Sequence, residues 1–279
     1  MENSLLGVRI NYPFLKKDFQ NILSQLINKK DSSFIFTINP EFIVDAQRDL
    51  YFKNILNKGS FNSADGIGVV IGLVYKDLIK TGFSKYEALY IVFKRFLKGS
   101  LVPSRFTGVE ISERIFEYCD ENYLSIFLLG GDKKKLISEN LLLKLEKKYK
   151  NINFVGASSS FSSKPNDDLI TLEFIKKCMR DKGVDSIDFI LVGYGHPYQE
   201  KWIDRNFSNI NIRIFVGVGG TFDFMTGNLK RAPLILQKLG VEWFYRLMQE
   251  PKRFKRIFKA VVVFSYLIFT KIKQLTKKN

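Results

Sequence analysis

The chain has 279 residues, of which 46% are hydrophobic, and it carries 44 Lys and Arg against 28 Asp and Glu, a formal net charge of +16. This length and apolar content exclude an intrinsically disordered chain and allow a substantial core. Two cysteines, Cys119 and Cys178, and a single histidine, His196, exclude a zinc site of the usual Cys/His kind. The first residues lack the pattern of a secretory signal, so we expect a cytoplasmic protein.

Five short runs of apolar, β-branched and aromatic residues predict strands at 33–38, 124–130, 152–157, 187–195 and 212–219. Their continuous apolar character is typical of strands that helices cover on both faces. Helical periodicity lies between them, at about 40–57, 66–79, 108–121, 132–149, 167–182 and 197–206. This alternation predicts a Rossmann-like α/β fold with a mostly parallel sheet and helices on both faces.

The last fifth of the chain is basic and amphipathic. Residues 230–279 hold 13 Lys and Arg against 2 Glu, interleaved with aromatic residues, as in a helix that lies on an anionic lipid surface. Two alternatives are a phosphate-binding role and a solvated basic face over an ordinary terminal helix. The apolar run 260–270 is shorter than the ~20 residues of a spanning helix. We therefore expect a main domain at 1–240 and a helical appendage at 241–279.

Glycines after the strand at 124–130 predict a phosphate-binding loop. Gly130 and Gly131 precede a helix, so bare backbone could approach a phosphate at the helix N-terminus. Ordinary turn chemistry explains the same pair, and both interpretations stay open. Asn39 and Gly195 also follow predicted strands, so we expect them at the same nucleotide-binding edge. The sequence contains neither a dinucleotide fingerprint nor a P-loop.

Asp65 stands in the segment SADGIG, which offers few local groups to neutralise its charge. Its carboxylate would suit a general base. The alternative is an N-cap for a helix that begins at Gly66, and sequence position alone favours the cap.

The segment GYGHPYQEKW crowds polar residues onto the first turn of a helix. Glu200 could complement the helix dipole, and Trp202 could lie in the core. His196 is more often a satisfied loop residue than a catalyst, and the proline after it restricts its backbone. Gln199 is the residue that folding explains least, so we expect it in the site.

Three arginines recur in the appendage, Arg246, Arg253 and Arg256. Planar guanidinium groups hold phosphate oxygens bidentately and would stabilise a departing diphosphate without a metal. No Asp-x-Asp pair, the metal-binding signature of many nucleotide-sugar enzymes, occurs in the sequence. We therefore expect neither a metal nor a cofactor.

Several blocks, in order, resemble the WecG/TagA/CpsF family of bacterial glycosyltransferases. They are TINPEFIVDAQRD, SADGIGVVIG, RFTGVEI, IFLLGG, ILVGYGHPYQEKWI and VGVGGTFDFMTGNLKRAPLILQKLGVEWFYRLMQEPKRFKRI, between about Thr37 and Ile257. The resemblance implies a metal-independent, inverting transfer of a sugar, typically N-acetylmannosamine or its uronic acid, from a UDP-sugar. The implied acceptor is linked to undecaprenyl diphosphate at the cytoplasmic membrane face, in cell-envelope polysaccharide or teichoic acid synthesis.

The resemblance also implies roles for individual residues. The family's base falls on Asp65, its active-site threonine on Thr37 and its glutamine on Gln199. The contacts with uridine and diphosphate fall on Gly130, Gly131 and Asp223. The C-terminal arginines that reach the site correspond to Arg246, Arg253 and Arg256. For Asp65 this raises the base above the N-cap, although both could hold at once.

The sequence departs from the family between about Tyr75 and Ser104, in an amphipathic stretch that is longer than usual. At helical spacing it carries Tyr86, Leu89, Tyr90, Phe93, Phe96 and Leu97. These side chains could pack on the core, meet a second subunit or contact a membrane, and core packing is favoured. The departure leaves the donor, the acceptor and the pathway open.

Alternative functions are a glucosyl or glucuronosyl transferase of the same family, for exopolysaccharide or capsule, and a catalytically silent nucleotide-sugar sensor or scaffold. Nucleic-acid binding is disfavoured because an apolar run interrupts the basic charge. We expect a peripheral protein on the anionic cytoplasmic face of the plasma membrane. Homo-oligomers stay open, because an undocked appendage would expose an apolar patch.

Overall fold

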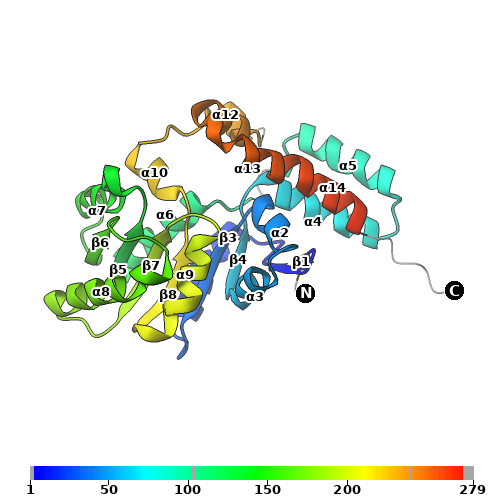
Figure 1. The fold of residues 1–279 in the computed structure, drawn as a ribbon. Coiled ribbons are helices and arrows are strands. Elements are labelled where there is room, and N and C mark those ends of the chain that lie inside the picture. Colours follow the sequence, from blue (N-terminus) through cyan, green and yellow to red (C-terminus); the bar gives the residue numbers. More distant parts are fainter. Residues whose placement is uncertain (1–2, 102–104, 239, 273–279) are drawn as a thin grey trace.

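The computed structural model describes residues 3–101, 105–238 and 240–272, and it is built around one parallel sheet (Figure 1). The strand order is β4-β3-β8-β7-β5-β6, and every neighbouring pair is parallel. The bounds are β3 Ser33–Ile38, β4 Phe61–Ala64, β5 Ser125–Gly130, β6 Asn153–Ser158, β7 Ile187–Gly193 and β8 Ile212–Gly217. The five predicted strands and the parallel sheet are confirmed. A short antiparallel hairpin, β1 Asn3–Leu5 with β2 Val8–Ile10, was not predicted.

Helices cover both faces of the sheet, as the continuous apolar strands predicted. Alternate strand residues point to opposite faces, so Ile35 joins one core cluster while Phe34 and Phe36 join the other. The first face is covered by α1 Phe19–Ile27, α6 Gly108–Glu121 and α7 Ile137–Lys148. The second face is covered by α2 Pro40–Asp45, α3 Leu50–Lys58, α4 Ile67–Lys80, α8 Asp168–Lys182 and α9 Tyr198–Asn206.

Two stretches that the sequence predicts as single helices each form two separate elements. The stretch 40–57 forms α2 and α3, because Asp49 leaves the helix and accepts a hydrogen bond from the Phe52 amide as an N-cap. The stretch 132–149 begins with the 3₁₀ turn Lys133–Lys135, and Leu136, in the left-handed conformation, separates that turn from α7. The helix α1 was not predicted.

The aromatic stretch after α4 forms α5, Lys85–Leu97, which opens with a capping box between Ser84 and Glu87. This helix packs on its neighbours through Ala88 and Val92, which are buried. The prediction that the six apolar and aromatic side chains pack on the core is wrong for five of them: Tyr86, Leu89, Tyr90, Phe93 and Leu97 are all at least half exposed. Only Phe96 turns inward, and it packs against the core.

After β8 the chain forms α10 Thr221–Thr226, α11 Leu234–Lys238 and then a series of helices that we call the C-terminal arm, residues 242–272. The arm comprises α12 Glu242–Gln249, the 3₁₀ turn Pro251–Arg253, α13 Phe254–Phe258, the π-helical turn Lys259–Val263 and α14 Phe264–Lys271. Figure 1 shows the arm lying beside α4 and α5 at one end of the sheet.

Glycines on α4 let the arm approach closely. A Cβ atom at Gly72 would lie 3.2 Å from side-chain atoms of both Phe264 and Ile268, and these two arm residues are buried. The arm therefore shares the core of the main sheet. None of the helices within the described residues is long and apolar enough to cross a membrane. Residues 273–279 of the predicted appendage lie outside the described residues.

Candidate active site

The carboxyl ends of β3, β4, β5, β7 and β8 open into a cleft of about 700 Å³, which the C-terminal arm covers. Ligands of open parallel sheets bind at this edge. Of the eleven site residues expected from the sequence, ten line the cleft: Thr37, Asn39, Asp65, Gly131, Gly195, Gln199, Asp223, Arg246, Arg253 and Arg256. Gly130 is outside the lining, where a Cβ atom would lie 3.0 Å from the backbone of Gly193.

Asp65 lies directly after β4, with its backbone N–H donating to the carbonyl of Ile38 at 2.8 Å. The helix α4 begins at Ile67, and its N-cap is Gly66 with no side-chain capping bond, so the N-cap interpretation of Asp65 is wrong. Burial raises the pKa of the Asp65 carboxyl to about 6, although Arg105 lowers it in part. A carboxylate with this pKa is mostly ionised at neutral pH and accepts a proton more readily than a solvated one.

An ion pair that the sequence did not predict stands near Asp65. Arg105, just before α6, binds Glu242 at the start of α12, and both residues line the cleft. Arg105 lowers the pKa of Asp65, whereas Glu242 raises it. Arg105 begins the RFTGVEI block of the family resemblance, which was the available signal for it. The pair joins the arm to the segment that surrounds the candidate base.

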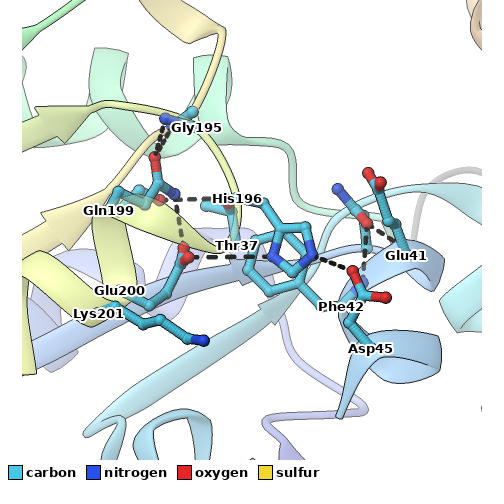
Figure 2. A network of polar contacts seen from close by, with 12 residues as sticks. Thr37, Glu41, Phe42, Asp45, Gly195, His196, Gln199, Glu200 and Lys201 are labelled. Carbon is cyan, nitrogen blue, oxygen red and sulfur yellow. Dashed lines mark hydrogen bonds and ion pairs between the residues drawn. The ribbon is translucent and has the colours of Figure 1, made fainter. Parts of the chain in front are cut away.

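Gln199 holds two loops of the cleft together (Figure 2). Its Oε1 atom accepts hydrogen bonds from the amides of Gly195, at 3.1 Å, and Gly219, at 2.8 Å. Its Nε2 atom donates to Glu200 at 2.6 Å, and the side chain is buried. Folding therefore does explain Gln199, contrary to the expectation from sequence. Its contact with a substrate stays a prediction.

Glu200 and His196 lie beneath these loops. Burial raises the pKa of Glu200 to about 8, so its carboxyl is mostly protonated at neutral pH and the helix-dipole explanation is wrong. His196 lies in the turn before α9, and its Nε2 atom is 2.8 Å from Asp45, as expected of a satisfied loop residue. Its side chain is buried, and its ring stacks on Phe42 at 4.0 Å. Trp202 is fully buried, which confirms its place in the core.

The first turn of α2 connects this buried network to the arm. Asn39 caps α2, with its Oδ1 atom accepting from the amides of Glu41 and Phe42. Glu41 binds Arg256 at 2.8 Å, and Asp45 binds Lys259 at 2.9 Å. The expected diphosphate contact of Arg256 stays a prediction, and the structure places this arginine in an ion pair at the margin of the cleft.

Three of these residues, Glu41, Asp45 and His196, bring ligand atoms within 4.8 Å of one another, a spacing that suits a metal ion. Both carboxylates already bind cationic side chains of the arm, however, and Nε2 of His196 lies 2.8 Å from Asp45. Binding a metal here would displace Arg256 and Lys259. The arrangement fits an ion-pair anchor for the arm better than it fits a metal centre.

The opposite wall of the cleft is cationic. Arg246 lies over the ring of Phe224 at 4.8 Å, and its Nη2 atom has no hydrogen-bond partner among the described residues although it is buried. A Cβ atom on Gly220 would lie 2.7 Å from Nη2, so this guanidinium lies directly against the loop after β8. Burial raises the pKa of Asp223, whereas nearby Lys135 and Arg246 lower it. The Nε atom of Arg246 lies 3.4 Å from Glu250, so the guanidinium is paired on one side only. A buried guanidinium nitrogen without a partner beside a glycine loop is suited to a phosphate.

Comparison with known proteins adds a match over nearly the whole chain. The model of the Glycosyl transferase WecG/TagA/CpsF family matches residues 3–79 and 88–278. The departure from the family expected at 75–104 is thus confined to 80–87, around the turn between α4 and α5.

Two individual proteins are similar over most of their length. A Staphylococcus aureus (strain MRSA252) protein is 28% identical over 275 residues, which are 98% of this chain and 94% of its own. A Bacillus subtilis (strain 168) protein is 28% identical over 251 residues, 88% and 85% of the two chains. Both carry the name N-acetylglucosaminyldiphosphoundecaprenol N-acetyl-beta-D-mannosaminyltransferase.

Proposed function

The chain belongs to the WecG/TagA/CpsF family of glycosyltransferases, and from this premise we propose that it transfers N-acetylmannosamine, or its uronic acid, from a UDP-sugar. The proposed acceptor is a sugar linked to undecaprenyl diphosphate, as in the names of its relatives. The product would serve cell-envelope polysaccharide or teichoic acid synthesis. The observation that carries the proposal is a single cleft that contains both a carboxyl of raised pKa, Asp65, and a buried guanidinium nitrogen, Nη2 of Arg246, that has no hydrogen-bond partner among the described residues.

The UDP moiety suits the cationic wall. Glycines at 131, 195 and 219–220 expose backbone at the cleft, and Arg246 lies against the last of these loops. Asp223, at the same wall, would accept hydrogen bonds from the uridine or its ribose, as the family resemblance implies. Arg253 also lines the cleft, 2.7 Å from Glu250, and a diphosphate would compete with Glu250 for it.

The transfer needs one base and one leaving-group stabiliser. In the proposed step the Asp65 carboxylate takes the proton of the acceptor hydroxyl as its oxygen attacks the anomeric carbon. The bond between that carbon and the UDP oxygen breaks, UDP leaves with the electron pair, and the arginines stabilise its charge. Attack opposite the leaving group inverts the anomeric configuration. Thr37, whose hydroxyl donates to the carbonyl of Gly217, lines the cleft, and we propose that it contacts the sugar, as the family resemblance implies.

We propose that the reaction needs no metal ion. Charge stabilisation by guanidinium groups replaces the divalent cation of other nucleotide-sugar enzymes, and Arg246, Arg253 and Arg256 supply three such groups around one cleft. No further cofactor has a role in the proposed step.

We also propose that the enzyme lies on the anionic cytoplasmic face of the plasma membrane as a peripheral protein. The arm carries exposed aromatic residues, including Phe254, Phe258 and Tyr266, among basic residues such as Lys252 and Lys255. Apolar side chains that enter the acyl boundary and lysines that contact lipid phosphates act together in such binding. A membrane position would also bring the cleft to a lipid-linked acceptor.

The deciding experiment is turnover with a panel of UDP-sugars and an undecaprenyl-diphosphate-linked N-acetylglucosamine acceptor in vesicles, with EDTA present. Release of UDP with one donor would establish the transfer and identify the sugar. Activity that returns only when a divalent cation is added would contradict metal independence. UDP binding without turnover on any donor would favour the silent sensor.

A further inference from the structure

Part of the cleft lining is apolar, and neither the nucleotide nor the sugar explains it. We call this part the apolar limb; its side chains come from α4, α5 and the arm. Six residues form most of this apolar limb: Ile67, Ile71, Phe96, Ile257, Val261 and Phe264. A sugar nucleotide is polar over most of its surface, so an apolar limb of this kind calls for a different ligand group.

Helical periodicity shows that the limb is formed by whole helix faces. On α4 the lining residues Ile67 and Ile71 are four apart, and on the arm Ile257, Val261 and Phe264 recur at intervals of four and three. Residues at these intervals lie on one side of a helix. The limb is therefore enclosed by two facing apolar stripes.

The third wall comes from α5. Phe96 is the one aromatic residue of the predicted stripe on α5 that turns inward, and it lines the limb. Gly240 lies against both Ile67 and Phe96, because a Cβ atom there would lie 3.2 Å from the Ile67 side chain and 3.4 Å from the Phe96 ring. The far end reaches the surface, since Val261 is 37% exposed.

Both main walls change from charged to apolar at the same end. Asp65 lies just before α4 and its apolar stripe, and on the arm Arg253 and Arg256 come just before Ile257. Side-chain contacts match the two helices in the same direction: Phe264 lies near Gly68 and Gly72, and Ile268 near Gly72. The base and the arginines therefore lie at the end of the apolar limb where the lining becomes charged.

From this arrangement we propose that the apolar limb binds the first isoprenoid units of the lipid-linked acceptor, so that the acceptor diphosphate lies where the limb meets the polar part of the cleft. A polyprenyl diphosphate joins an apolar chain to an anionic group, and the cleft joins an apolar limb to a cationic part in the same order. Removing the chain from water favours binding in proportion to the apolar area buried. This inference rests on the proposed function, and it names the place of the acceptor within the same cleft.

The test compares two soluble acceptors that differ only in the chain: N-acetylglucosaminyl diphosphate esterified to farnesol or to methanol. We expect the wild type to show a KM at least tenfold lower for the farnesyl acceptor. Val261→Glu places a charge in the limb and should raise that KM at least tenfold, with kcat/KM for the methyl acceptor within twofold of the wild type. Val262→Glu is the matched control, because Val262 is 50% exposed and outside the cleft lining, and it should change neither value.

Ile71→Trp provides a second variant that fills the limb without adding a charge, and an unchanged rise of Tm with UDP would verify that each variant folds. The proposal is overturned if the wild-type KM is the same for both acceptors. It is also overturned if Val261→Glu and Ile71→Trp weaken both acceptors equally or leave both unchanged. In these cases transfer itself proceeds, so the proposed function would stand.

Direct binding separates the two failures if the wild type transfers sugar to neither acceptor. Calorimetry would then compare farnesyl diphosphate with inorganic pyrophosphate. Tighter binding of farnesyl diphosphate, lost in Val261→Glu and kept in Val262→Glu, would support the limb while the transferase proposal failed. Equal binding of the two probes would overturn the limb as well.

Discussion

Nδ1 of His196 lies 4.0 Å from Oε2 of Glu200, and neither atom has a hydrogen-bond partner among the described residues. Nε2 of His196 is 2.8 Å from a carboxylate oxygen of Asp45, so this nitrogen carries the proton and Nδ1 keeps its lone pair. Burial lowers the pKa of His196 and raises that of Glu200. The pair is therefore a neutral imidazole facing a protonated carboxyl, and its charge state is set by burial.

The buried carboxyl should make stability depend on pH. The pKa of Glu200 is about 8 in the folded protein and 4.5 ordinarily, so between these values the folded state holds a proton that the unfolded state releases. The free energy of unfolding then falls as pH rises from about 4.5 to 8. Glu200→Gln imitates the protonated acid and cannot titrate. We expect it to gain roughly 2–4 kcal/mol relative to the wild type between pH 5 and pH 9.

Urea unfolding of both proteins at pH 5, 7 and 9 measures this difference. His196 is common to both proteins, so its own titration largely cancels. Curves of unfolding free energy against pH that run parallel for the two proteins would show that Glu200 is ionised in the folded state.

The regular elements of the fold follow from periodicity, and that is why they could be predicted. β3 and β5 are buried along their whole length and their sequences SFIFTI and SIFLLG show it. β4 was not predicted because it has only four residues and half of them, Asn62 and Ser63, are polar. Both are buried, and Asn62 donates hydrogen bonds to the carbonyls of Arg9 and Leu56, which only the folded chain brings near.

The candidate site was predicted better than its internal contacts. Residues that follow parallel strands meet at one edge, so the predicted strands placed Asn39 and Gly195 together, whereas the family resemblance placed Thr37 and Asp65 in the same site. The ion pairs Arg105–Glu242 and Arg256–Glu41 join positions 137 and 215 residues apart, and no local pattern encodes such a contact. The apolar face of the arm was recognised, but its docking depends on small residues of α4 such as Gly72.

Asp65→Asn should separate activity from folding. Loss of the base is expected to lower turnover by about 10²–10⁴-fold, with UDP binding retained. Because burial raises the pKa of Asp65, its charge opposes folding at neutral pH, and the variant should be more stable by roughly 1–3 kcal/mol. Sugar transfer and Tm at pH 7.5 measure both effects. Asp77→Asn, on α4 and outside the cleft lining, is the control. Full activity of Asp65→Asn would remove the base assignment.

The pH profile should report the charges around Asp65. If its carboxylate is the base, kcat/KM rises with pH through a midpoint near 6 and then levels off. Arg105 lowers this pKa and Glu242 raises it, so Arg105→Gln should move the midpoint up and Glu242→Gln should move it down. The measurement is kcat/KM between pH 5 and 8.5 for the three proteins. Shifts in the same direction would mean that breaking the ion pair displaces α12 and that charge is not the cause.

The ion pair between Glu41 and Arg256 gives two explanations of this arginine that can be separated. As an anchor, it holds the arm on α2; as a substrate contact, it binds the diphosphate. Both carboxylate oxygens of Glu41 accept hydrogen bonds from the guanidinium, but 42% of the Arg256 side chain is exposed. Solvent therefore weakens the pair, and a double-mutant cycle should give a coupling of about 1 kcal/mol.

Glu41→Gln removes the anchor and leaves the arginine charge free, so UDP affinity should be kept or increased. Arg256→Gln should weaken UDP binding as well as the docking of the arm. Calorimetric titration with UDP and the rate of trypsin cleavage within 242–272 measure the two functions. Equal loss of UDP affinity in both variants would show that Arg256 acts on the nucleotide only through the position of the arm.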